Sequence, residues 1–222
     1  MVAATRTSTA RAGLERDDVV QAALELVEEG GAEALTMRKL AAALGVTTTT
    51  IYWHVGHRDE LVIAVIDRLA RQLAQAPVVG RTPRDRVLSA ARNIWTNALA
   101  HRNVTALASQ VGATTLLELP LEVALVAEFE AAGVRGPAAR DALRSVLMCI
   151  AGFLIGAWRP DDASPAPLRH GALWSTVEDP AIAPATVEAM AEAPDVERLF
   201  TLALVAIVDT YLPAAAHLET AP

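Results

Sequence analysis

Apolar residues recur at helical spacing along most of the chain. The first stretch with this pattern covers residues 17–30, where the apolar positions are Val19, Val20, Ala23, Leu24, Leu26 and Val27. Positions three and four apart share one face of an α-helix, so this stretch predicts an amphipathic helix. Asp17 or Asp18 is suited to cap its start, and Gly30-Gly31 is suited to end it.

Proline, glycine and threonine separate the later helical stretches. Thr36 precedes one of them and Gly45 follows it, which suits a helix cap and a left-handed turn. Five prolines break residues 159–193, which predicts a long connection with one helical turn. The pattern predicts further helices over residues 37–44, 59–75, 83–101, 104–111, 120–133, 137–158 and 194–212. With no strand pattern and no internal repeat, the expected fold class is all-α.

One segment disagrees with the helical pattern. From Thr47 to Val55 every residue except His54 is β-branched or aromatic. Such residues favour strands, so propensity alone predicts a strand here.

Composition narrows the class of protein. The 222 residues are 53% hydrophobic, so a ligand pocket, a subunit interface or both must bury apolar surface. The uncharged run from Ser145 to Trp158 is shorter than the roughly 20 residues of a membrane span. The first 16 residues lack the apolar segment of a secretory signal. Cys149 has no partner cysteine and is expected as a buried small side chain, so we expect a cytoplasmic protein with no membrane partner.

The charge distribution says more than the net charge of −7, which alone argues against binding nucleic acid. No Asp or Glu lies between residues 34 and 58, a stretch that holds Arg38, Lys39 and Arg58. The polar N-terminal arm carries three more arginines, Arg6, Arg11 and Arg16. A local basic footprint is compatible with docking to phosphates, and ordinary surface charge is the alternative.

Residues 35–55 carry the motif that decides the interpretation. Leu35-Thr36-Met37-Arg38-Lys39-Leu40-Ala41-Ala42-Ala43-Leu44-Gly45-Val46 is followed by four threonines and then by Ile51-Tyr52-Trp53-His54-Val55. With Arg58-Asp59-Glu60-Leu61 after it, this segment resembles the helix-turn-helix of the tetracycline-repressor (TetR) family, over about residues 17–75. A tight turn between two helices needs a left-handed residue such as Gly45. The resemblance implies that the threonine-rich segment is a short recognition helix, held by packing rather than by propensity.

Carried over position by position, the resemblance implies a set of DNA contacts. The predicted DNA-binding residues are Thr36, Arg38, Thr48, Thr49, Thr50, Tyr52, His54 and Arg58. The threonines at positions 48–50 would enter the major groove, where threonine reads sequence only weakly. The others would mainly meet phosphates. Trp53 is expected in the core, and His57 is left open between a loop residue and a contact to the DNA backbone.

The same resemblance implies that the rest of the chain is a helical core for ligand binding and dimerisation. Residues 140–158 and 194–212 would form a four-helix bundle with a second copy, with the monomer's own core as the alternative. Asp141, Arg144, Arg198 and Asp209 would pair at its rim. Residues suited to line a ligand pocket are Trp95, Asn97, His101, Asn103, Gln110, Thr114, Phe153, Trp158 and Trp174.

Several classes of chemistry find no support in the sequence. By an ungapped count, Ala74 and Ala108 stand where the tetracycline repressors have the two histidines of their drug and metal site. We therefore expect an effector other than magnesium–tetracycline, and neither a metal nor a cofactor. No phosphate loop, nucleophile motif or pair of catalytic carboxylates is found, so we do not expect an enzyme.

These features together predict a homodimeric transcriptional regulator. Residues 1–16 would be a flexible arm, residues 17–60 the helix-turn-helix domain, and residues 61–222 the ligand-binding and dimerisation domain. We expect a repressor that a small molecule releases from a palindromic operator. The alternatives are a ligand-independent regulator or activator and a helical enzyme.

Overall fold

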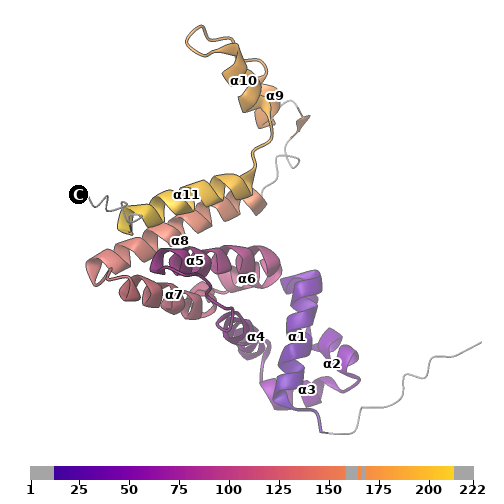
Figure 1. The fold of residues 1–222 in the computed structure, drawn as a ribbon. Coiled ribbons are helices and arrows are strands. Elements are labelled where there is room, and N and C mark those ends of the chain that lie inside the picture. Colours follow the sequence, from indigo (N-terminus) through magenta and orange to yellow (C-terminus); the bar gives the residue numbers. More distant parts are fainter. Residues whose placement is uncertain (1–12, 159–164, 167–168, 213–222) are drawn as a thin grey trace, which may run out of the picture. The chain divides into compact units, whose positions relative to one another are not determined.

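The computed structural model describes residues 13–158, 165–166 and 169–212 (Figure 1). No strand occurs in these residues, which confirms the predicted all-α fold class. The helices are α1 (Arg16–Gly30), the 3-10 helix η1 (Ala32–Ala34), α2 (Met37–Leu44), α3 (Thr48–Val55), α4 (Arg58–Leu73), α5 (Pro83–Ala100), α6 (Arg102–Gln110), α7 (Thr114–Ala131), α8 (Pro137–Trp158), α9 (His170–Trp174), α10 (Pro184–Ala191) and α11 (Val196–Tyr211).

The chain divides into two compact units. The first combines residues 1–78 with residues 96–124, and the second combines residues 79–95 with residues 125–222. Helices α5 and α7 therefore belong in part to each unit. The first unit contains the predicted helix-turn-helix, and the second contains the two apolar late helices.

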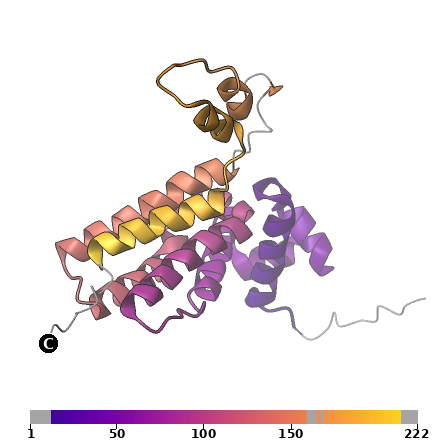
Figure 2. The ribbon, with the colours of Figure 1, turned by 45° about the horizontal axis from the view of Figure 1, so that its top comes forward.

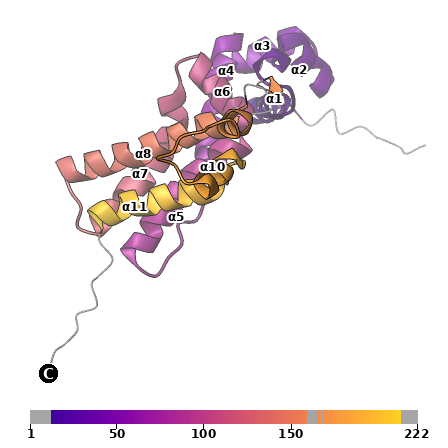
Figure 3. The ribbon, with the colours of Figure 1, turned by 90° about the horizontal axis from the view of Figure 1, so that it is seen from above.

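Helix α1 is the centre of the first unit, because it contacts α2, α3, α4 and α6 (Figures 1 and 3). Its buried face is the stripe that the sequence predicts: Val19, Val20, Ala23, Leu24 and Val27. Helix α4 buries eight residues of its own in this unit. Burial of one aliphatic side chain contributes about 1.5–3 kcal/mol, so this apolar packing is the main force that holds α2 and α3 in place.

Hydrogen bonds and an ion pair of Arg68 also link α4 to α1, and they stabilise the unit less than the apolar packing does. Nε of Arg68 donates to Oε1 of Gln21 at 2.7 Å, and its Nη1 lies 2.5 Å from Oδ1 of Asp17. The Asp17 side chain is mostly exposed. Exposed ion pairs contribute about 0–1 kcal/mol, which is less than one buried leucine.

Helices α8 and α11 form the long pair of the second unit (Figure 2). They are antiparallel, because the hydroxyl groups of Ser145 and Tyr211 lie 3.1 Å apart, whereas Phe153, later in α8, meets Phe200, which is earlier in α11. Val146, Ile150 and Leu154 of α8 are buried, as are Phe200, Leu204 and Val208 of α11.

Two arginines of α5 pair with carboxylates in the second unit. Arg84 binds Asp209 with two hydrogen bonds, Nε to Oδ1 at 2.5 Å and Nη2 to Oδ2 at 3.0 Å. Arg86 Nε donates to Oε2 of Glu128 at 2.6 Å. The expectation that Asp209 pairs at the rim of a dimer bundle is therefore wrong, because α5 of the same chain supplies its partner.

Four local predictions need correction. Helix α1 begins at Arg16 because the Asp18 carboxylate accepts the backbone N–H of Glu15 at 2.9 Å, which makes Glu15 the cap. Helix α7 begins at Thr114, so Pro120 lies inside it rather than at its start. The described residues of the connection after α8 include two short helices, of which α10 begins with Pro184 at a position that proline favours. The last helix begins after Pro194, with Asp195 as its cap.

We predict that Asp209→Asn lowers the free energy of unfolding at neutral pH and that the deficit fades in acid. The hydrogen bonds from Arg84 hold the pKa of Asp209 below its ordinary value of 3.8. A group whose pKa is lower in the folded state contributes stability above its unfolded pKa, and that contribution is lost as the pH falls through the folded pKa. Urea unfolding of both proteins between pH 7 and pH 3 measures the difference.

Arg84→Met should reproduce this pH dependence, because it removes the same ion pair. A deficit in Asp209→Asn that stayed constant down to pH 3 would contradict the explanation.

Candidate functional site

The turn between α2 and α3 has the geometry that the sequence predicts. Gly45 ends α2 in the left-handed conformation, with φ 67° and ψ 29°. The backbone N–H of Val46 donates to the carbonyl of Ala41 at 3.0 Å, which closes the turn. At the other end of α2, Oγ1 of Thr36 accepts the backbone N–H of Lys39 at 3.2 Å. Both ends of α2 are therefore capped, and the caps fix where α3 begins.

The threonine-rich segment is helical because it is capped and anchored. Oγ1 of Thr47 accepts the backbone N–H of Thr50 at 3.2 Å, and the two hydroxyl groups lie 2.9 Å apart. Ile51 and Val55 are buried, and α3 contacts both α1 and α2. Packing thus overrides the strand propensity of the segment.

One side of α3 is turned to solvent, and we call it the α3 face. Its exposed side chains are Thr48, Thr49, Tyr52 and Trp53. Thr50 and His54 are half-buried beside it, and the Thr50 hydroxyl is already engaged with Thr47. The α3 face offers hydroxyl groups, a phenol and an indole, which can donate hydrogen bonds to phosphates and contact base edges.

The expectation for Trp53 is wrong. Its side chain is 82% exposed and meets the ring of His54 edge-on at a centroid distance of 5.0 Å. Ile51 and Val55 lie on the opposite side of this two-turn helix and take the buried positions. An indole on the α3 face enlarges the surface that is available to a partner.

The other predicted DNA-binding residues surround this helix with different roles. Thr36 and Arg38 are exposed at the start of α2. The guanidinium group of Arg58 binds the carbonyls of Leu35 and Ala32, so a phosphate contact by Arg58 stays a prediction. His57 is exposed, and its backbone N–H donates to Oε2 of Glu60 at 3.0 Å in the cap of α4. Arg16 is exposed at the start of α1, whereas Arg6 and Arg11 lie outside the described residues.

Two of the residues predicted to bind a ligand lie together in an aromatic cluster. Trp95 of α5 is only 4% exposed and stacks on Phe200 at 4.3 Å, with an interplanar angle of 19°. The ring of Phe153 of α8 makes edge-to-face contacts with both, at centroid distances of 6.5 Å from Trp95 and 5.7 Å from Phe200. Phe200 is not among the predicted ligand-binding residues, although it belongs to the same apolar stripe as Leu204 and Val208.

Two other candidates contact the end of α1, and their role in binding a ligand stays a prediction. Nδ1 of His101 lies 2.7 Å from Oε1 of Glu28, and Nδ2 of Asn103 donates to the carbonyl of Glu28 at 2.8 Å. Both contacts join the start of α6 to the last turn of α1, inside the first unit. Asn97 has a buried amide nitrogen with no hydrogen-bond partner among the described residues, which is a suitable group for binding a ligand.

The remaining candidates are scattered. Gln110 is exposed at the end of α6, Thr114 begins α7, and Trp158 is half-buried at the end of α8. Nε1 of Trp174 donates to Nε2 of His170 at 3.1 Å within α9. No group of three or more His, Cys, Asp or Glu side chains is arranged for a metal ion in the described part of the chain. The carboxyl group of Glu118 was not predicted, and its pKa is raised by burial and by the nearby Glu122.

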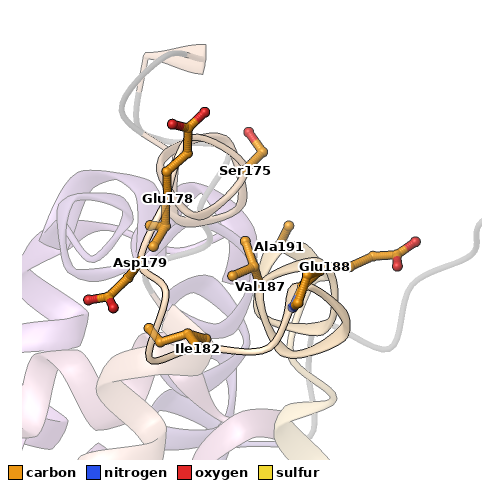
Figure 4. A pocket seen from close by; sticks show the side chains of 9 residues that line it. Ser175, Glu178, Asp179, Ile182, Val187, Glu188 and Ala191 are labelled. Carbon is orange, nitrogen blue, oxygen red and sulfur yellow. The ribbon is translucent and has the colours of Figure 1, made fainter.

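A pocket of about 490 Å³ lies between α10 and the loop that follows α9 (Figure 4). Val177, Ile182 and Val187 contribute apolar walls, and Glu178 and Glu188 extend outward from its rim (Figure 4). None of the predicted ligand-binding residues lines it.

Comparison with known proteins agrees with the geometry of the first unit. Residues 19–65 match the family model described as bacterial regulatory proteins, tetR family. The tetracycline repressor protein class D of Escherichia coli is 48% identical over 61 residues, which cover 27% of this chain and 28% of that repressor. This likeness therefore spans less than a third of the relative's own length.

Two further comparisons cover most of the chain. The tetracycline repressor protein class A from transposon 1721 of Escherichia coli is 30% identical over 202 residues, covering 88% of this chain and 89% of that one. The crystal structure of apo ActR from Streptomyces coelicolor matches with a TM-score of 0.69 at 25% identity, over 90% of this chain and 96% of that one. The chain belongs to the TetR family of bacterial regulatory proteins.

We predict that Trp53→Ala changes the free energy of unfolding by less than about 0.5 kcal/mol, because an exposed side chain loses little packing. Trp95→Ala is the matched comparison, and it should cost about 3–5 kcal/mol because that indole is buried. Thermal or urea unfolding measures both. A large loss of stability in Trp53→Ala would show that the indole packs in the core after all.

Proposed function

We propose that this protein is a ligand-responsive repressor that binds operator DNA as a homodimer. The α3 face carries this proposal. It lies on a capped, packed helix inside a stretch, residues 34–58, that contains no Asp or Glu. The α3 face offers hydroxyl, phenol and indole donors, and Arg38 of the same stretch adds a cation, which suits the sugar–phosphate backbone and the major groove.

The proposed contacts follow from exposure on the first unit. Thr48 and Thr49 would meet base edges, since both side chains are exposed at the start of α3. Tyr52 and Arg38 would bind phosphates. The remaining residues would contribute secondary contacts: Thr36 from the cap of α2, and Thr50 and His54 from half-buried positions beside the α3 face. Threonine reads base edges only weakly, so two copies of α3 in successive major grooves would supply the specificity.

A second copy of the chain is the proposed partner of the α8–α11 pair. We call its exposed apolar side the bundle patch, which is made of Met148, Ala151, Gly152, Ile155, Leu199, Leu202 and Ala206. The antiparallel pairing of α8 with α11 places these residues in one region, because Met148 and Ile155 of α8 lie level with Ala206 and Leu199 of α11. Exposed apolar side chains gathered on one helix pair are typical of an interaction surface.

Helix α8 is also long and apolar enough to cross a membrane by length and composition alone. Its contacts favour a second copy instead. One side of α8 is already buried, and α11 packs against it. The exposed side of α8 is not apolar throughout, because its N-terminal half carries the charged side chains of Arg140, Asp141 and Arg144. Charges at the edge of an apolar patch suit a protein interface, and we place the protein in the cytoplasm.

The aromatic cluster of Trp95, Phe153 and Phe200 is the proposed place of effector binding. Aromatic rings favour planar apolar ligands through stacking and edge contacts. ActR has been crystallised in complex with actinorhodin, and a variant TetR from Acinetobacter baumannii in complex with minocycline. Ala74 and Ala108 offer no metal ligand, so a planar organic effector without magnesium is the class we propose.

Release from DNA would be a population shift. The dimer would exchange between a conformer whose two α3 helices match the spacing of successive major grooves and one whose helices do not. An effector that binds the second conformer more tightly weakens DNA binding by at most the ratio of its affinities for the two conformers. Coupling of about 1–3 kcal/mol would weaken DNA binding roughly 5–150-fold.

We predict tight, salt-sensitive binding of the purified protein to one near-palindromic segment of the DNA that flanks its gene. Arg38→Ala should weaken binding and reduce the slope of log K against log salt by about 0.9 for each phosphate that the dimer no longer neutralises. Tyr52→Phe should weaken binding with little change in the slope, because it removes a neutral donor. Fluorescence anisotropy at several salt concentrations measures all three proteins.

The same assay then tests the effector proposal, with planar aromatic compounds added to the complex. Release by one of them supports a ligand-responsive repressor, and tight DNA binding that no compound weakens favours a ligand-independent regulator. Weak binding that no DNA sequence improves would contradict the assignment of the α3 face.

We predict that Leu202→Glu converts the dimer to a monomer at micromolar concentration. Leu202 is 56% exposed in the single chain and lies in the bundle patch, so a second copy would bury it. An unpaired carboxylate in an apolar interface costs several kcal/mol. Leu119→Glu is the matched control, since Leu119 is 51% exposed on α7, outside the patch. Light scattering during size-exclusion chromatography measures the mass, and a dimeric Leu202→Glu would contradict the proposed interface.

A further inference from the structure

Arg58 makes an unusual pair of contacts at the start of α4. Its Nε donates to the carbonyl of Leu35 at 3.2 Å, in a part-buried position, and its Nη2 donates to the carbonyl of Ala32 at 3.3 Å. These carbonyls belong to η1 and to the residue that follows it, immediately before the cap of α2. The two bonds therefore join the start of α4 to the entry of α2.

The segment between these ends contains the whole helix-turn-helix. Residues 36–57 hold α2, the Gly45 turn and α3, and α3 leads directly through Gly56 and His57 into Arg58. A bond between the two ends closes this segment into a loop, which reduces the number of open conformations available to it. Arginine suits this task, because its planar guanidinium group presents several donors in a fixed fork and can meet two carbonyls at once.

We propose that Arg58 is a positioning residue that holds α3 in its DNA-reading orientation, and not the phosphate contact that the family resemblance implies. We call its two bonds the Arg58 clasp. The inference rests on the proposed DNA-binding function of the α3 face. The clasp uses the Nε and Nη2 donors on backbone carbonyls, so these donors do not face DNA while it is closed.

Arg38 provides the matched comparison within the same unit. It is exposed on the first turn of α2, and its guanidinium group forms no hydrogen bond or ion pair with the residues that the structure describes. A phosphate contact needs such an uncommitted cation. The two arginines therefore predict different results when each is changed to glutamine, although both changes remove one positive charge.

Hydrogen exchange of the full-length protein without DNA tests the clasp directly. In Arg58→Gln, amides of residues 37–55 should exchange about tenfold faster, the effect expected when a hydrogen bond from a charged donor is removed. Arg38→Gln should leave these rates unchanged. Arg58→Lys keeps the charge but can reach only one carbonyl at a time, so it should also exchange faster. This variant also provides the measurement if Arg58→Gln fails to fold.

Anisotropy titrations on the DNA duplex that the wild-type protein selects from its gene's flanking region supply the second readout. Arg58→Gln and Arg58→Lys should both weaken binding, Arg58→Gln by about tenfold with an unchanged salt slope. Arg38→Gln should instead reduce the slope by about 0.9 for each phosphate left without its cation. Unchanged exchange rates in Arg58→Gln would overturn the clasp. A reduced salt slope in Arg58→Gln, together with wild-type DNA binding by Arg58→Lys, would also overturn it. Because the exchange experiment contains no DNA, failure of the clasp is distinguishable from failure of the proposed function.

Discussion

The burial of Ile51 and Val55 against α1 and α2 is the interaction on which the α3 face depends. Threonine, valine and aromatic residues are each disfavoured in a helix by up to about 0.7 kcal/mol relative to alanine. Over the eight residues of α3 this penalty is comparable with the roughly 1.5–3 kcal/mol that each of the two buried side chains contributes. The Thr47 cap alone, worth about 1 kcal/mol, would not offset that penalty and keep Thr48, Thr49 and Tyr52 on one face.

Much of the helical framework could be predicted from the sequence because the signals are local. Thr36, Gly45 and Pro83 mark helix ends through caps and fixed backbone angles, and the structure has α2 and α5 beginning or ending at these residues. The recognition helix could not be predicted from propensity, because its helical state comes from tertiary packing. The place of Pro120 could not be predicted for the same reason. A proline inside a helix is tolerated where long-range packing compensates for the hydrogen bond it removes.

The candidate site could be predicted in part. Exposure of Thr36, Arg38, Thr48, Thr49 and Tyr52 follows from the register of α2 and α3, which the motif contains. Tryptophan is usually buried, yet a two-turn helix has few inward positions, and two aliphatic side chains occupy them in place of Trp53. The contacts of Arg58, His101 and Asn103 could not be predicted, since each joins residues at least 23 positions apart. The ligand candidates rest on residue type alone, and the structure brings them together only in part: Trp95 lies with Phe153, and His101 lies with Asn103 at Glu28.

The exposed stripe of α8 changes character along its length, and this has a consequence for how the regulator would leave DNA. Its C-terminal half is apolar, whereas charged side chains are confined to its N-terminal half. An interface centred on apolar surface is insensitive to ionic strength, whereas attachment to phosphates weakens steeply as salt displaces the protein's cations. In the proposed dimer, rising ionic strength would therefore detach both copies of α3 together and return an intact dimer to solution. The two-fold spacing of the recognition helices would be preserved for the next encounter with an operator.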